Sequence, residues 1–148
     1  MYEQFDMGAH YVRSPFWQAA REMQLALNQR SPAGAFIWTN VNELDMARRR
    51  IPASLEARLE ANDLLLEEIR ITDPEVVLFF TGPRYDDRLR TLLRGVKLTP
   101  LPGVGLEHVS RVEHERLPKR SFRTYHPAYL RRARQWPTLA QELSKNAR

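Results

Sequence analysis

Apolar positions in the chain follow two patterns, one typical of helices and one typical of buried strands. An apolar residue at every third or fourth position predicts helices over 15–28, 54–69, 85–94 and 128–143. Short runs of consecutive apolar residues predict buried strands over 35–41 and 76–80. Residues 98–105 are consistent with a short strand and a loop. Alternating residues over 107–125 predict either a hairpin around Leu117-Pro118-Lys119 or a loop that leads into a last strand at 121–125.

Strands that alternate with helices favour an α/β fold. We expect a single domain over 1–148, built as a three-layer α/β/α sandwich around a short, mostly parallel central sheet. The continuously apolar run 76–80 is expected at the centre of that sheet, covered on both faces. Pro137 is expected to kink the terminal helix, because proline removes a backbone donor inside a helix.

Composition narrows the function classes. The chain has 148 residues, of which 43% are hydrophobic and 28% charged, as in ordinary globular proteins. It has neither an apolar run of membrane-spanning length nor a signal-peptide pattern, so we expect a cytoplasmic protein that does not bind membranes. It has no cysteine, which excludes disulfides, thiolate nucleophiles and iron–sulfur clusters. Its four histidines lack metal-ligand spacing, and we expect neither a metal nor a cofactor.

Positive charge is concentrated in the last third of the chain. The net charge is +5, and residues 101–148 contain ten Lys or Arg against four Asp or Glu. Such a local excess is typical of a face that binds nucleic acid, but a solvated arginine-rich helix has the same composition. Charge alone leaves both interpretations open.

Two polar residues follow predicted strands and are candidates for a binding site. Pro127 biases the backbone of His126 toward an extended conformation, which places the histidine where a strand ends and a loop begins. Asn40 lies near the end of the apolar run 35–41 and offers both a donor and an acceptor. Open α/β sheets bind ligands at the carboxyl ends of their strands. If the two strands run in the same direction, both side chains reach one crevice.

The residues around the histidine resemble a known family. Thr124-Tyr125-His126-Pro127-Ala128-Tyr129-Leu130 resembles the last signature motif of the uracil-DNA glycosylase superfamily, closest to its family four. Residues 39–41 are similar to that family's second-strand motif, and residues 64–82 to its next helix and strand. The resemblance spans about 36–134. It implies a DNA-binding protein that flips a damaged base out of the duplex and cleaves its N-glycosidic bond.

The resemblance also implies roles for individual residues. His126 would stabilise the uracil oxygen that gains charge as the base leaves, and Asn40 would read the pyrimidine edge. Leu130, next to Tyr129, would fill the gap in the base stack as an apolar wedge. The remaining DNA contacts would be Tyr129 and the basic residues near the motif, namely Arg123, Arg131, Arg132 and Arg134.

The chain departs from the family in its first part. No Gly-rich first motif precedes Asn40, the four cluster cysteines are absent, and Glu43 or Asp45 is the candidate for a water-activating carboxylate. Three hypotheses follow. The protein is a minimal glycosylase, a non-catalytic DNA-binding relative, or a partial domain whose missing central strand comes from a partner chain or from a second copy.

Overall fold

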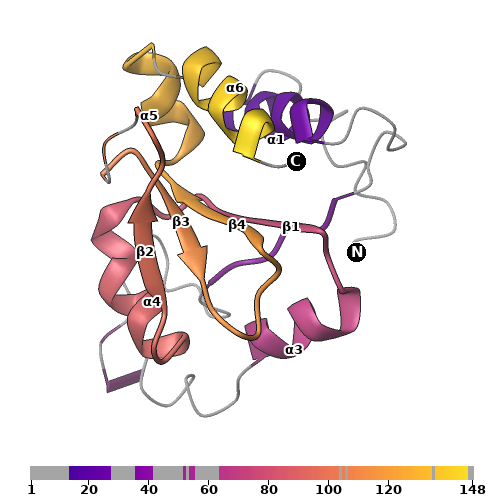
Figure 1. The fold of residues 1–148 in the computed structure, drawn as a ribbon, viewed down its shortest axis with the longest axis vertical. Coiled ribbons are helices and arrows are strands. Elements are labelled where there is room, and N and C mark those ends of the chain that lie inside the picture. Colours follow the sequence, from indigo (N-terminus) through magenta and orange to yellow (C-terminus); the bar gives the residue numbers. More distant parts are fainter. Residues whose placement is uncertain are drawn as a thin grey trace.

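The computed structural model describes residues 14–27, 36–41, 52, 54–55, 64–103, 105, 107–134 and 136–146. The elements in these ranges form an α/β fold with five α-helices and one open four-stranded mixed sheet (Figure 1). In chain order they are α1 (Pro15–Leu27), α3 (Leu64–Thr72), β1 (Val76–Phe79), the 3-10 helix η2 (Pro83–Tyr85), α4 (Asp86–Leu92), β2 (Lys97–Pro100), β3 (Val109–Glu113), β4 (Arg120–Thr124), α5 (Pro127–Arg132) and α6 (Trp136–Asn146).

The sheet is mixed, so the prediction of a mostly parallel sheet was wrong. Its strand order is β1-β4-β3-β2, and only β1 and β4 are parallel, whereas β4 with β3 and β3 with β2 are antiparallel. The reason is connection length. Residues 101–108 and 114–119 join the last three strands with no helix in their described part, and a parallel pair needs a crossover of about a dozen residues or more. The hairpin alternative for 107–125 is confirmed.

Strand β1 is covered on both faces, as expected, but it is not central. Leu78 and Phe79 pack into different hydrophobic clusters on the two faces. Among the described residues, β1 pairs only with β4 and forms one edge of the sheet. The hypothesis that a partner chain or a second copy supplies a missing strand stays a prediction.

The apolar run before Asn40 is neither a strand nor buried in its described part. Residues 36–40 have no regular secondary structure, and Ile37 is 72% exposed. Trp38 packs on the Phe16 and Trp17 rings of α1, whereas Val41 packs into the cluster beside α3 and α4. The segment therefore crosses from one face of the sheet to the other. The aromatic residues of this segment, although typical of strands, pack against helix α1 and not within a pair of strands.

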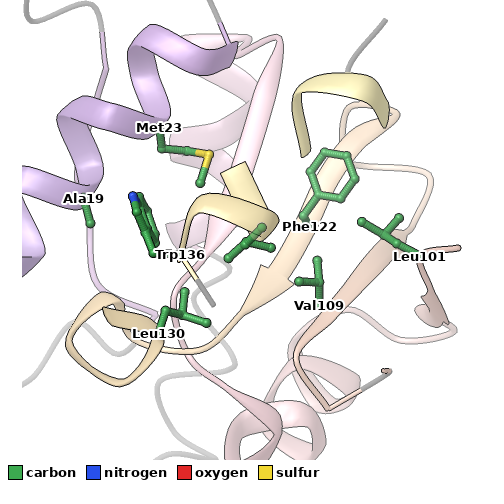
Figure 2. Close-up of a cluster of buried hydrophobic side chains, with 8 residues drawn as sticks. Ala19, Met23, Leu101, Val109, Phe122, Leu130 and Trp136 are labelled. Carbon is green, nitrogen blue, oxygen red and sulfur yellow. The ribbon is translucent and has the colours of Figure 1, made fainter. Parts of the chain in front are cut away.

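Two hydrophobic clusters hold helices on opposite faces of the sheet. In the first, side chains of α1, α5 and α6 meet those of the sheet, and Figure 2 shows Met23, Leu130 and Trp136 with Phe122 in this cluster. In the second, α3 and α4 pack on Phe79 and Val112. Figure 1 shows α1, α5 and α6 together on one side and α3 on the opposite side. The alternation of β4 separates the two, because Phe122 belongs to the first cluster and Arg123 faces α4.

The last helical region is two helices and not one kinked helix. Arg134 has a φ of 55°, a left-handed conformation that ends α5 and re-aims the chain. Helix α6 then begins at Trp136, with Pro137 in its first turn, where a missing N–H costs nothing. Among the described residues, no helix has the length and apolarity that a membrane span requires.

Candidate nucleic-acid interface

The carboxyl ends of β1 and β4 lie at the same end of the sheet because these two strands are parallel. The loop after β1 is fixed there by the N–H of Gly82, which donates to the Thr124 carbonyl at 2.9 Å. Gly82 has a φ of 67°, and a Cβ at this position would lie 3.0 Å from the Tyr125 ring. Glycine is therefore required both by backbone conformation and by the close approach of Tyr125. The sequence predicted a binding site at this end of the sheet, where the strands have their carboxyl ends.

His126 follows the end of β4, as predicted, and it caps helix α5. Its Nδ1 accepts a hydrogen bond from the Ala128 N–H at 3.2 Å, and Pro127 occupies the first helical position. Because Nδ1 is the acceptor, the neutral ring carries its proton on Nε2. Desolvation by partial burial lowers the pKa of His126 below its usual 6.5. At neutral pH the exposed imidazole is thus an uncharged Nε2–H donor.

Several aromatic side chains lie near the end of β4, and one of them contacts the histidine ring. Tyr125 and Tyr129 stack with centroids 4.3 Å apart, and Phe16 of α1 lies 5.5 Å from the His126 ring. Phe16 also lies 6.1 Å from Trp38. Tyr129 and Trp38 remain 40% and 44% exposed, so part of each ring is accessible to a ligand. We call these residues the strand-end face: Phe16, Trp38, Tyr125, His126 and Tyr129.

Asn40 lies on the segment that reaches this face. Trp38, two residues earlier, contacts Phe16, and Phe16 contacts His126, so the segment and the histidine share one aromatic neighbour. Asn40 is exposed and does not end a strand. Glu43 and Asp45, the candidate carboxylates, lie outside the described residues. Among the residues described, no group of three or more acidic or histidine side chains is arranged to hold a metal ion.

Leu130 does not have the exposure that a wedge needs. Its side chain is only 1% exposed and belongs to the apolar cluster with Met23 and Trp136 (Figure 2). The wedge prediction was therefore wrong. Neighbouring residues of a helix point about 100° apart, so when Leu130 turns toward the core its neighbour Tyr129 turns toward solvent. The exposed apolar surface of α5 comes from the tyrosine.

Of the four arginines that were predicted to contact DNA, two pair with carboxylates of the protein and two are exposed. Arg123 has a fully buried side chain, paired with Asp86 at 2.9 Å and hydrogen-bonded to the Glu107 carbonyl, so its assignment to DNA binding was wrong. Arg131 pairs with Glu22 at 2.7 Å and donates to Gln18, which ties α5 to α1. The guanidinium of Arg131 therefore bonds to side chains of the protein, which makes it a poor candidate for a phosphate contact.

Arg132 and Arg134 are exposed, as phosphate contacts must be. Arg132 lies three residues after Tyr129 on α5, a spacing that places the two side chains on one helical face. Cationic groups therefore remain beside the strand-end face, although fewer than the sequence suggested.

Sequence reasoning missed two members of the strand-end face. Phe16 and Trp38 were assigned to a helix core and to a buried strand. The available signal was the clustering of aromatic residues in 16–17 and 36–38, two short stretches that each precede polar residues. No family model, curated protein or solved structure matches this chain, so the likeness to uracil-DNA glycosylases rests on the residues quoted above.

Proposed function

We propose that this protein binds DNA through an unpaired base, which it holds on the strand-end face. The observation that carries the proposal is the exposed Tyr129, whose ring lies 4.3 Å from that of Tyr125, the residue that directly precedes the neutral His126. Stacking on exposed aromatic rings is how proteins hold unpaired bases with little regard to sequence. A base is available for such stacking only in a single strand or when it is flipped from a duplex.

Three kinds of contact support this function. The Tyr129 ring offers a stacking surface, the Nε2–H of His126 offers a donor to a base oxygen, and Arg132 offers a charge to a nearby phosphate. The finer fold proposal is a reduced uracil-DNA glycosylase-like sandwich. It is supported by the two helical layers and by the position of the His-Pro motif at the carboxyl ends of the parallel strands.

Fluorescence anisotropy with labelled oligonucleotides tests the binding proposal. We expect single-stranded DNA, or a duplex with one unpaired base, to bind more tightly than a perfect duplex, with affinity that falls as salt rises. Tyr129→Ala should raise the Kd about 5- to 150-fold, because stacking of one base contributes about 1–3 kcal/mol. Ile71→Ala is the matched control, since Ile71 is 71% exposed on α3, in the opposite layer. If no DNA binds at low salt, the proposal fails.

Excision of the base is a second candidate, favoured by the tautomer of His126. A neutral Nε2–H beside the base can stabilise an oxygen that gains negative charge as the glycosidic bond breaks. The test is incubation with uracil-containing DNA, followed by alkaline cleavage of abasic sites. His126→Ser keeps a favourable helix cap and removes the donor, so product should disappear while the fold persists. DNA binding without product would leave a non-catalytic binding protein.

A further inference from the structure

A second polar site lies at the opposite end of β4, in the turn of the β3–β4 hairpin. The turn borders a solvent-open hollow of about 350 Å³, at the small end of the range for ligand pockets. Hydrogen bonds brace it: the Leu117 N–H donates to the His114 carbonyl at 3.1 Å, and the Ser121 hydroxyl donates to the Pro118 carbonyl at 2.7 Å. The hollow is lined by Arg111, Val112, Glu113, His114, Leu117, Pro118 and Lys119.

Arg111 is held in one orientation within this lining. Its Nη1 donates to the Lys119 carbonyl at 3.0 Å, and its guanidinium lies 5.2 Å from the centroid of the Phe122 ring. The hydrogen bond to the carbonyl uses only one nitrogen of the planar fork. A guanidinium fixed in this way loses little rotamer freedom when it binds a ligand, and its geometry suits two oxygens of one anion.

His114 and Lys119 bring further donors to the same hollow. The Nδ1 of His114 accepts from the Arg116 N–H at 3.2 Å, which leaves the ring proton on Nε2. Lys119 is exposed, and its ammonium is a strongly hydrated donor to phosphate oxygens. The residues that line this hollow thus include one guanidinium, one imidazole with a ring N–H and one ammonium, donors that favour a ligand with oxygen acceptors.

The one acidic residue of the lining is engaged with another strand. Glu113 accepts a hydrogen bond from the Thr99 hydroxyl at 2.9 Å and lies opposite Lys97 in the β2–β3 ladder. The cross-strand lysine offsets its charge. Leu117 and Pro118 supply apolar walls that displace water and strengthen the polar contacts of a bound group.

We propose that this hairpin hollow binds a phosphate group through Arg111, His114 and Lys119. The group belongs either to a small phosphate-bearing ligand or to the backbone of a nucleic acid. The site does not depend on the proposed function of the strand-end face. The hairpin turn precedes β4 and His126 follows it, so the five-residue strand separates the two by roughly 17 Å at about 3.4 Å per residue.

NMR titration of the full-length protein tests the proposal with two probes, inorganic phosphate and a single-stranded oligonucleotide. We expect saturable shifts of the Arg111 side-chain Nε–H and the His114 ring resonances. Saturation by inorganic phosphate identifies a site for free phosphate groups, whereas saturation by the oligonucleotide alone identifies a backbone contact. Both results support the site. If neither probe gives saturable shifts at these two residues, the proposal is overturned.

Variants that remove one positive charge distinguish a specific phosphate site from nonspecific electrostatic attraction of anions to the protein. We expect Arg111→Gln to weaken binding of the responding probe about tenfold or more, and Lys119→Gln about fivefold. Lys119 makes no side-chain contact required for the turn that we describe, so it tests the site even if Arg111→Gln destabilises the hairpin. Arg70→Gln is the matched control, an exposed arginine on α3 that does not line the hollow. An equal loss for the control would overturn the proposal.

Tyr129→Ala distinguishes this site from the strand-end face. It should leave the hairpin shifts with inorganic phosphate unchanged. Lys119→Gln should preserve the difference in affinity between single-stranded and duplex DNA. The two proposals therefore fail independently.

Discussion

On one face of the sheet, α1, α5 and α6 pack through apolar side chains and a half-exposed Arg131–Glu22 pair, whereas on the other face α4 is joined to β4 by a buried pair. Arg123 and Asp86, the buried pair, are 0% and 14% exposed. Arginine thus has three roles in this chain: a core ion pair, a link between helices, and an exposed charge at Arg132. Net charge alone does not distinguish them.

The largest expected effect lies in the layer with the buried pair. Asp86→Ala should lower the free energy of unfolding by about 3–5 kcal/mol, because it removes the carboxylate that offsets the charge of the buried Arg123 guanidinium. Asp87→Ala is the control within the same helical turn, since Asp87 is 98% exposed and pairs with Arg90 at the surface. Urea denaturation measures both variants. Equal effects would mean that the buried pair does not hold α4 to the sheet.

Substitutions at two neighbouring residues of α5 test the layer formed by α1, α5 and α6. Leu130→Ala should cost about 2–5 kcal/mol of unfolding free energy, because it leaves a cavity beside Met23 and Trp136. Tyr129→Ala should change stability much less, while it reduces binding of unpaired DNA. Thermal unfolding and anisotropy on the same samples compare the two effects. A stable Leu130→Ala variant that loses only DNA affinity would restore the wedge role.

The junction between β1 and β4 should show an intermediate effect. Gly82→Ala places a side chain at φ 67° and ψ 173°, a backbone conformation almost restricted to glycine, which costs about 1–3 kcal/mol, and moves a methyl group against Tyr125. Gly95→Ala is the control, since Gly95 also has a positive φ but no atom within 4 Å of an added Cβ. Denaturation midpoints measure the cost of a side chain at positive φ in both variants, and we expect a larger loss for Gly82, where the contact with Tyr125 is added. No excess would mean that this contact is loose.

The smallest expected effect is the contribution of His126 to the pH dependence of the free energy of unfolding. The pKa of this histidine is lowered in the folded protein by desolvation, so the unfolded chain binds the proton more readily. Its contribution to stability is complete above about pH 6.5 and is lost as the pH falls through the folded pKa. His126→Ser keeps a cap and does not titrate. The difference in unfolding free energy between wild type and variant should therefore shrink below pH 6.5, and a pH-independent difference would contradict the burial effect.

Periodic patterns predicted most of the elements but not their arrangement. Met23 in α1 and Leu65, Leu66 and Ile69 in α3 are buried at positions that fit the helical spacing, because an amphipathic helix shows its buried side in its spacing. The position of β1 at an edge was not predictable, since a strand covered on both faces looks the same at the edge and at the centre of a sheet.

The candidate site was predictable only where local chemistry fixes the backbone. Pro127 and the end of β4 placed His126 correctly, because both constraints are adjacent in sequence. The burial of Leu130 and the pairing of Arg123 with Asp86 depend on residues from other elements, which spacing does not encode. Phe16 reached the site from α1, more than a hundred residues away from His126 in the chain.

Arg131 and Trp136 both bond to Glu22 across more than a hundred residues of chain, which has a consequence for folding order. Helix α5 has only six residues, too few to be stable alone in water. Contacts of this sequence separation form slowly, because a long loop must close before they contribute. We therefore expect α1 to gain these partners only after α5 and α6 have been synthesised, and the strand-end face, which includes Tyr129 of α5, to form no earlier than α5.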